Sequence, residues 1–420
     1  MSKESLAING GKPVRERPFP ARFMLDEAEK SAVMALFDAA LNSGNAFGYN
    51  GPPEQEYERK FAEYLGGGFA DGVNSGTNAV FVSLAALDLE PFSEVIVPPI
   101  TDPGGVMPVV YIGCVPVVAD AAPGSYNTSA EQIAPLINER TRAILVAHIA
   151  GEPVDMDPIM ELAKQHNLYV VEDCAQAHGS LYKGRKCGTI GHIAAFSTMF
   201  GKHHCTGGQG GIVFTKDEKL HFEGRRAADR GKPFGLVGAA GNVRAALNCN
   251  LNDLSATIGI VQLDKLQGIV QRRRAVGERI RKALADHPLI RVSKQVPDTQ
   301  SSYWFLRMTM DLEKCSVTKQ EFCRALSMEG IPLNPEYRHI PCEQPWFKEQ
   351  KVFGKSGFPW QCSDYKGDRN PVFKVDNAIQ AALTGFNIGI NESWIESDAD
   401  DTIRAILKVA DAYGKTEKAK

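Results

Sequence analysis

The sequence predicts an α/β protein with a mostly parallel sheet flanked by helices. Between residues 70 and 215, short apolar runs alternate with segments of helical spacing, and such uninterrupted runs are typical of strands buried on both faces. The 420 residues suffice for about two or three domains. Hydrophobic residues make up 43 % of the chain and charged residues 23 %, which is typical of globular proteins. This composition excludes a collagen-like, coiled-coil or intrinsically disordered protein.

The expected elements follow in order along the chain. Helical spacing extends over 27–41 and 54–65, where Tyr57, Phe61 and Leu65 lie four residues apart on one face. Strands are expected at 95–97, 115–118, 143–147, 168–171, 193–196 and 212–214, with helices at 78–87 and 158–166. A long helix is expected at about 253–285, followed by a strand at 303–310 and by helices at 319–329, 378–383 and 400–413.

The pattern changes after the long helix, which predicts three parts. Residues 1–25 form an N-terminal arm rich in Gly, Pro and Arg, residues 26–270 form a large domain around the sheet, and residues 271–420 form a smaller C-terminal α/β domain. Ligands of parallel α/β sheets bind beyond the carboxyl ends of the strands. The residues that follow the apolar runs are therefore the candidates for chemistry.

Charge and cysteine content narrow the class of protein. The 47 Lys and Arg residues are balanced by 50 Asp and Glu, so no basic field favours nucleic acid as a partner. Nine cysteines without a C-x-x-C pair indicate reduced thiols and a cytoplasmic protein. The first residues lack an apolar signal core, and prolines interrupt the weakly charged stretch 103–119, so we expect no membrane span.

Two segments place reactive side chains after apolar runs. LYVVEDCAQAHG (168–179) puts Asp173 at the end of a strand, although a carboxylate there is also a common helix cap. IAAFSTMFGKHHCTGGQGG (193–211) carries Lys202 in a loop of small residues. Lys202 is either an ordinary exposed lysine or a nucleophile, and a nucleophilic lysine needs surroundings that lower the pKa of its amine.

A third segment, GVNSGTNAV (72–80), opens a helix with Ser75, Gly76 and Thr77. The free N–H groups of a helix N-terminus suit a phosphate, whereas the simpler interpretation is an ordinary Ser/Thr cap. A phosphate cradle, an acid and a lysine are together what pyridoxal 5′-phosphate (PLP) requires. The phosphate anchors the cofactor, the acid pairs with the pyridine nitrogen, and the lysine holds the aldehyde.

With these motifs the chain resembles the DegT/DnrJ/StrS family of sugar aminotransferases. The resemblance covers nearly the whole chain, including NSGTNAV (74–80), GCVPVVAD (113–120), VEDCAQAHGSLYKGRKCGTIGHIAAFS (171–197), GKHHCTGGQGGIVFT (201–215) and LNCNLNDLSATIGIVQL (247–263). It implies the fold-type-I architecture of PLP-dependent transferases, with a seven-stranded sheet in the large domain.

The resemblance also implies roles for single residues. Lys202 and Asp173 are the catalytic pair, with Lys202 as the Schiff-base lysine and Asp173 on the pyridine nitrogen. Gln176 contacts the phenolic oxygen of the cofactor. Phosphate ligands are Gly76, Thr77 and Ser197, and Asn248 reaches the phosphate site of a neighbouring subunit. The resemblance thus implies a homodimer with shared active sites.

Three positions depart from the family pattern. Asp102 stands where the family usually has an aromatic residue that stacks on the cofactor, and Asn250 replaces an arginine. The late Tyr–Pro–His segment is here Tyr337 to Glu343. Because such positions lie near the sugar pocket in the family, Asp102, Tyr337 and His339 are the candidate substrate residues.

His203 and His204 follow the lysine directly and are either loop-shaping residues or, less expectedly, a base or metal ligands. We expect no metal site. Some relatives have histidine in place of the lysine and are dehydratases, so Lys202 favours transamination. The dehydratases that use an iron–sulfur cluster also carry a Cys-x-Cys element, which this sequence lacks.

The expected reaction is a ping-pong transamination from glutamate or glutamine to a keto-sugar or ketocyclitol. The segment LAINGGKPVRERPFP (6–20) resembles the branch that acts on inososes, which favours a ketocyclitol, although it is also compatible with an arm that straps a dimer. Two alternatives stay open: a PLP-dependent dehydratase or lyase on the same fold, and a non-catalytic regulator that retains the fold.

Overall fold

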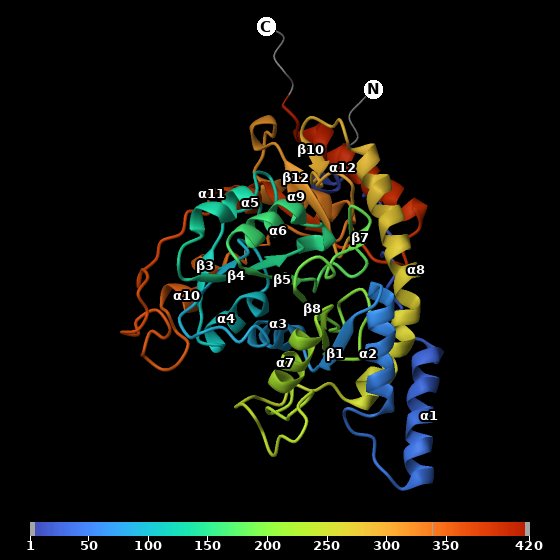
Figure 1. Cartoon of the computed structure of the whole chain (residues 1–420). Helices are drawn as coiled ribbons and strands as arrows, with labels where there is room; N and C mark the ends of the chain where they lie inside the picture. Colours follow the sequence, from blue (N-terminus) through green and yellow to red (C-terminus); the bar gives the residue numbers. More distant parts are fainter. Residues whose placement is uncertain (1–4, 338, 416–420) are drawn as a thin grey trace.

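The computed structural model describes residues 5–337 and 339–415, so the ends of the predicted arm (1–4) and of the predicted C-terminal domain (416–420) lie outside it. A seven-stranded sheet with the order β1-β9-β8-β5-β4-β2-β3 forms the centre of the larger part (Figure 1). Its strands are β1 (Phe69–Val73), β2 (Glu94–Val97), β3 (Val115–Val118), β4 (Thr141–Ala147), β5 (Tyr169–Asp173), β8 (Ile193–Ser197) and β9 (Gly211–Thr215). Only β9 runs against its neighbours in this sheet, which confirms the mostly parallel α/β architecture.

Helices cover both faces of this sheet, as the uninterrupted apolar strands predict. Because side chains alternate along a strand, Leu145 and Val146 belong to cores on opposite faces. One core includes α3 (Gly76–Ala85) and α7 (Glu218–Ala228). The opposite face packs against α2 (Pro52–Leu65), α6 (Met156–Gln165) and the first half of α8 (Asp253–Ala283).

A second core lies around a four-stranded antiparallel sheet with the order β10-β12-β14-β13. Its elements are β10 (Ile290–Val292), β12 (Leu306–Met310), β13 (Leu333–Asn334), β14 (Gly385–Ile388), α9 (Lys319–Met328) and α12 (Glu396–Tyr413). Leu6 of the N-terminal arm is buried in the same core, and Arg15 pairs with Asp398 of α12 at 2.8 Å. The described part of the arm therefore packs on the C-terminal part of its own chain.

Helix α8 joins the two cores along one side of the molecule (Figure 1). Leu266 packs under the large sheet, whereas Ile280 belongs to the second core. The predicted domain boundary at residues 270 and 271 thus falls inside a continuous helix, and it stays a prediction. Farther along the chain, Trp360 and Ala378 pack back against the core of the large sheet.

The remaining elements are short or peripheral. They are α1 (Glu27–Ser43), α4 (Met107–Tyr111), α5 (Ala130–Ile133), α10 (Pro345–Lys348), α11 (Asp376–Thr384), and a small sheet of β6 (Leu181–Tyr182), β7 (Arg185–Lys186) and β11 (Thr299–Gln300). Helix α1 packs beside α8 and extends beyond the body of the molecule (Figure 1). None of the helices in the described part of the chain combines the length and apolar content that a membrane span requires.

Candidate active site

A cavity with about 800 Å³ of empty volume lies at the carboxyl ends of the central strands. It is lined by residues from the end of β5, the end of β8 and the start of α3, which are far apart in sequence. Seven of the residues expected from the sequence share this cavity: Gly76, Thr77, Asp102, Asp173, Gln176, Ser197 and Lys202. The topology thus brings the three motifs together where ligands of parallel sheets bind.

Asp173 is the last residue of β5 and faces this cavity. Its Oδ1 accepts a hydrogen bond from the Ala175 amide at 2.9 Å. A Cβ atom at Gly105 would lie 2.9 Å from Asp173 Oδ2, so Gly105 leaves room for that oxygen. Burial raises the pKa of Asp173, while the Ala175 amide and the charge of Lys202 oppose the rise. As a carboxylate, Asp173 suits a cationic partner in the cavity, such as a protonated pyridine nitrogen.

Glu172 precedes Asp173 and points to the opposite face of the sheet, where it is fully buried. Its carboxylate accepts hydrogen bonds from the amides of Gly188 (2.8 Å), Ile190 (2.8 Å) and Gly191 (2.6 Å). Although burial opposes ionisation, the hydrogen bonds and the neighbouring His148 lower the pKa of Glu172. Glu172 is therefore a structural carboxylate that fixes the loop after β7, and Asp173 is the acid available for chemistry.

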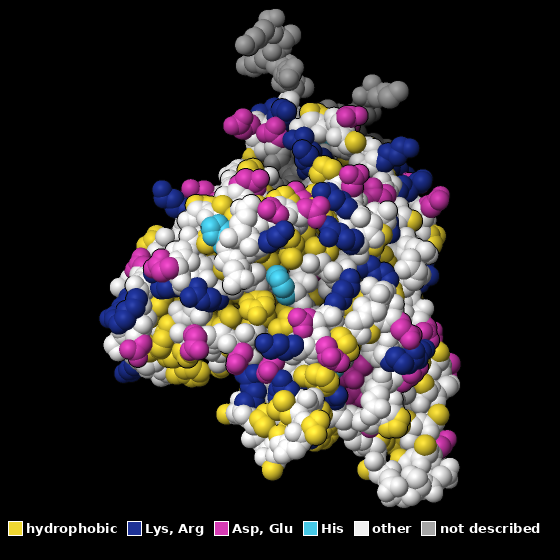
Figure 2. Space-filling model, in the orientation of Figure 1, with side chains coloured by type: hydrophobic (Ala, Val, Ile, Leu, Met, Phe, Trp, Pro, Cys, Tyr) yellow, Lys and Arg dark blue, Asp and Glu magenta, His cyan; other side chains and the backbone are white. Residues whose placement is uncertain are grey.

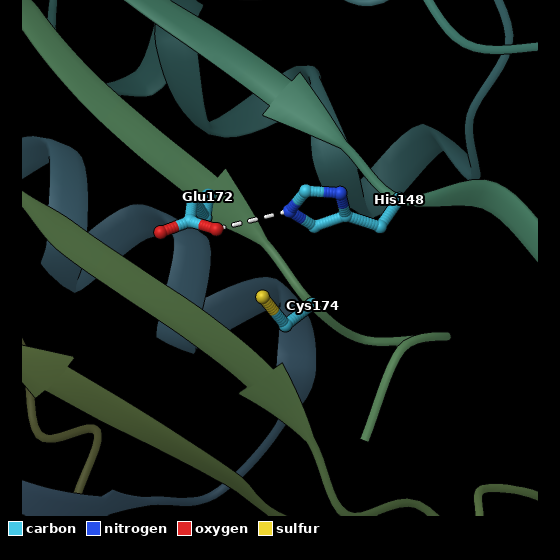
Figure 3. Close-up of side chains that lie close together, drawn as sticks. All are labelled: His148, Glu172 and Cys174. Carbon is cyan, nitrogen blue, oxygen red and sulfur yellow. Dashed lines mark hydrogen bonds and ion pairs between the residues drawn. The ribbon is translucent and has the colours of Figure 1, made fainter. Parts of the chain in front are cut away.

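His148 completes the surroundings of Glu172 (Figure 3). The Val154 amide donates to His148 Nδ1 at 3.0 Å, so the ring proton resides on Nε2, which donates to Glu172 Oε2 at 3.0 Å. Cys174 lies close enough for these three side chains to form a possible metal-ligand set. With Nε2 protonated and both Glu172 oxygens accepting hydrogen bonds, His148 and Glu172 form a hydrogen-bonded pair in this structure.

Lys202 lies across the cavity from Asp173 and is only 7 % exposed. Its Nζ is 4.0 Å from the centroid of the Trp304 ring. Burial lowers the pKa of Lys202 to about 8, against the attraction of Asp173 and Asp102. An amine in this state is available both as a nucleophile and as a proton carrier near neutral pH.

The start of α3 and Ser197 form the polar end of the cavity. Ser75 caps α3 by accepting a hydrogen bond from the Asn78 amide at 3.1 Å. A Cβ atom at Gly76 would lie 2.5 Å from Ser197 Cβ and 2.7 Å from its Oγ, so only glycine lets the helix start approach Ser197 this closely. Backbone N–H groups of a helix N-terminus next to the Thr77 and Ser197 hydroxyls are a donor set that fits a phosphate.

Gln176 connects the cavity to its outer wall. Its Oε1 accepts from the Ala150 amide at 2.8 Å, and its Nε2 donates to Tyr337 Oη at 2.9 Å. His339 is exposed and packs edge-on against the Tyr337 ring. Asp102 caps the turn at the cavity rim through the Gly104 amide at 3.0 Å. Of the three candidate substrate residues, only Asp102 lines the cavity; Tyr337 contacts the lining residue Gln176, and His339 lies one contact farther out.

Asn248 lies apart from the cavity lining and is exposed. Its Oδ1 accepts a hydrogen bond from Asn250 Nδ2 at 2.8 Å. Its action on the site of another subunit stays a prediction.

Two other residues near the site were not predicted from the sequence. Gln209 lines the cavity from the glycine-rich turn, and Trp304 covers Lys202 from a remote segment. In the sequence, Trp304 is simply a tryptophan inside an apolar run, and nothing there links it to Lys202.

The histidines next to Lys202 are buried among ordinary hydrogen-bonding partners. His203 Nε2 contacts the Ser302 carbonyl oxygen at 3.1 Å, and His204 Nε2 contacts Tyr57 Oη at 2.8 Å. Burial lowers the pKa of both imidazoles well below their usual value, so they are neutral. These contacts favour the loop-shaping interpretation over that of a base.

Comparison with known proteins assigns the chain to a family. The profile of the DegT/DnrJ/EryC1/StrS aminotransferase family matches residues 27–360. The GDP-perosamine synthase of Escherichia coli O157:H7 is 33 % identical over 289 residues, which are 67 % of this chain and 76 % of that protein. The dTDP-4-dehydro-2,6-dideoxy-D-glucose 3-dehydratase of Saccharopolyspora spinosa is 30 % identical over 337 residues, 73 % of this chain and 71 % of that protein.

Among solved structures, the aminotransferase from Psychrobacter cryohalolentis superposes with a TM-score of 0.81 at 29 % identity, covering 94 % of this chain and 100 % of that one. This agreement confirms the fold-type-I architecture that the sequence predicts. The profile match extends over most of the chain and includes the segments that build the cavity. The chain belongs to the DegT/DnrJ/EryC1/StrS aminotransferase family, and its cofactor is PLP.

Proposed function

We propose that this protein transfers an amino group from glutamate or glutamine to a keto-sugar or ketocyclitol. The observation that carries the proposal is the placement of Lys202 and Asp173 in one cavity whose far end is a phosphate-type donor set. Bound PLP would supply an electron sink that stabilises negative charge on the substrate carbon. The cavity meets the three needs of this cofactor with Asp173, Lys202 and the start of α3.

The protein residues then have separate tasks. The Asp173 carboxylate would keep a proton on the pyridine nitrogen, and the donors at Gly76, Thr77 and Ser197 would anchor the phosphate. The neutral Lys202 amine would act as the base that removes the proton from Cα of the donor amino acid and would then carry that proton within the cavity. Proton transfer by a positioned base of this kind contributes about 10²- to 10⁴-fold to the rate. Gln176, held by Ala150 and Tyr337, would orient the phenolic edge of the ring.

The acceptor class is supported by the relatives and by the rim. GDP-perosamine synthase is named for a nucleotide-linked amino sugar, which supports a sugar acceptor. Asp102, Tyr337 and His339 would contact the hydroxyl-rich part of such a substrate. The segment 6–20 keeps a ketocyclitol as the other acceptor within the same proposal.

A half-reaction tests this function without knowledge of the acceptor. The PLP-loaded protein is mixed with excess glutamate or glutamine in the absence of a ketone, and the oxoacid released is counted per active site. Transamination predicts one equivalent of oxoacid and a cofactor left in the amine form. No release with either donor would contradict the proposal, whereas free ammonia released when a ketone is then added would instead indicate a dehydratase. A panel of nucleotide-linked 4-keto-sugars and inososes then selects the acceptor.

We propose further that the active unit is a homodimer. Leu41 of α1 is 79 % exposed, Phe200 beside the cavity 67 %, and Val237 in the loop between α7 and α8 fully exposed. Figure 2 shows apolar side chains on both projections of the molecule, α1 and this loop. A second copy covering these surfaces would remove them from water and would bring Asn248 to the neighbouring phosphate site.

Mixed dimers test the sharing of sites. Lys202→Ala and Asn248→Ala chains are each expected to be inactive or strongly impaired alone. If Asn248 acts on the neighbouring subunit, mixing the two variants creates one site with both residues intact, and activity returns. If Asn248 acts within its own chain, mixing restores nothing.

The nine cysteines, none of them in a disulfide, support the cytoplasm as the compartment.

A further inference from the structure

The segment Ser301–Phe305, called the strap below, lies between β11 and β12 and crosses over the Lys202 loop. The sequence predicted a strand from residue 303, but β12 begins only at Leu306. The reason is Tyr303, whose φ of 49° is left-handed and incompatible with a strand. A non-glycine residue keeps such a conformation only where its surroundings enforce it, and such residues cluster at functional sites.

The surroundings of the strap supply this constraint. The Trp304 amide donates to the Ala150 carbonyl at 3.0 Å, and the Ser302 amide donates to the Gly151 carbonyl at 3.2 Å. Ala150 is itself left-handed, with φ 63°. A Cβ atom at Gly151 would lie 2.6 Å from Ser302 Oγ, so the close approach of the two segments requires glycine there. The two strained turns, at Ala150 and at Tyr303, therefore stabilise each other through these contacts.

A buried arginine fixes the other side of the strap. Arg273 of α8 donates through Nη1 to the carbonyl oxygens of Tyr303 and Trp304, both at 3.1 Å. These contacts involve the main chain of the strap, so they do not depend on which side chain stands at position 304. A substitution of Trp304 therefore leaves the path of the strap supported.

The strap holds the Lys202 loop on both sides of the lysine. Trp304 Nε1–H donates to the carbonyl oxygen of Gly201 at 3.0 Å. On the other side, His203 Nε2 is 3.1 Å from the Ser302 carbonyl oxygen and must be the donor, because a carbonyl can only accept. Between these two bonds, Lys202 Nζ rests 4.0 Å above the Trp304 ring. In the described part of the chain, no acceptor lies within hydrogen-bonding distance of this amine.

We propose that the strap is the positioning element of Lys202, and that the face of Trp304 receives the free amine during turnover and sets its affinity for protons. This inference rests on the proposed role of Lys202. The amine must leave the cofactor, carry a proton and return, so it needs a resting place that neither captures it as a salt bridge nor releases it to water. An aromatic face is such a place because it attracts an ammonium group without accepting its proton.

The other groups facing the amine act in known directions. Asp173 and Asp102 favour the ammonium form, whereas burial disfavours it. Burial lowers the pKa of the nearby His178 to about 4, so this imidazole is neutral near pH 7. The face of the Trp304 ring also favours the ammonium form of Lys202. Removing the face while keeping an apolar side chain should therefore lower the pKa of the amine, by about half a unit to one unit for a partly desolvated pair.

The test uses the full-length protein loaded with pyridoxamine 5′-phosphate, in which Lys202 is free and the site is filled. Trace acylation with an isotopic anhydride between pH 6 and pH 10 (about 0.5 unit steps), quantified on the Lys202 peptide, gives the pKa of this amine. We compare wild type with Trp304→Phe, Trp304→Leu and the matched control Trp346→Phe. Trp346 lies at the edge of the large-domain core, outside the cavity lining.

We expect the pKa of the Lys202 amine to be highest in the wild type and in Trp346→Phe, lower in Trp304→Phe, and lowest in Trp304→Leu. An unchanged or raised pKa in Trp304→Leu overturns the inference. If Trp304→Leu does not fold, Trp304→Phe must still titrate below Trp346→Phe, and equality of the two overturns it. Borohydride trapping of PLP on Lys202 separates the two proposals. If trapping succeeds while the pKa is insensitive to Trp304, only the role of the strap fails.

Discussion

Replacing Gly76 with alanine probes the phosphate end of the cavity directly. The added Cβ would lie 2.5 Å from Ser197 Cβ, whereas carbon atoms in contact are normally about 3.5–4.0 Å apart. Relief of this overlap must separate the start of α3 from Ser197, which moves two of the groups that are expected to bind the phosphate. Overpacking of this kind costs about 1–3 kcal/mol, equivalent to about 5- to 150-fold in an equilibrium constant.

The assay is a PLP titration of Gly76→Ala, followed by cofactor absorbance, together with thermal unfolding of the cofactor-free protein. Gly224→Ala is the matched control, because a Cβ on that residue of α7 would have its nearest neighbour at 3.8 Å, which is ordinary contact. We expect the control to bind PLP normally and to gain roughly 0.5–1 kcal/mol in stability as a helix-interior Gly→Ala change. A folded Gly76→Ala protein with wild-type PLP affinity would refute the assignment of the phosphate site.

Three further predictions concern the acids and histidines. Asp173→Asn should bind PLP in a folded protein yet lose at least about 10²-fold in turnover, because an amide does not hold the proton on the pyridine nitrogen; wild-type turnover would contradict this role. Glu172→Gln, on the other face of the same strand, should instead lower the free energy of unfolding by about 1–3 kcal/mol, because its amide group would meet backbone donors, and equal stability would contradict it. Burial lowers the folded-state pKa of His178 to about 4, so stability should fall as the pH drops from the unfolded-state pKa of about 6.5 toward 4, by up to about 1.4 kcal/mol per pH unit. His178→Asn should lose less stability than wild type between about pH 7 and pH 5, as measured by denaturant unfolding, and an identical loss would count against a neutral His178.

Local sequence patterns were sufficient to identify candidate residues that the fold brings together in one cavity. Lys202, Asp173 and Gly76 each belong to a contiguous motif, and the end-of-strand rule places all three at one edge of the sheet. The same alternation that builds the two cores also separates Asp173 from Glu172, although the sequence alone shows only two adjacent acids.

Features that depend on distant segments could not be predicted in this way. Strand β1 reads FADGV, and its Asp71 and Gly72 are poor strand formers; Asp71 is tolerated because Arg225 of α7 pairs with it at 3.3 Å. Trp304 reaches Lys202 across 102 residues of sequence through the left-handed turn at Tyr303, which no periodicity reveals. Asn248 lies apart from the cavity of its own chain, and its proposed role depends on a second subunit.

The central claim is that Lys202 is the residue to which PLP is attached. The PLP-loaded protein is reduced with borohydride, digested, and mapped by mass spectrometry, with Lys202→Ala as the control. We expect one cofactor per chain, fixed on the peptide that contains Lys202, and none on the control. A label on another lysine, or a loaded wild-type protein in which the Lys202 peptide stays unmodified, would contradict it.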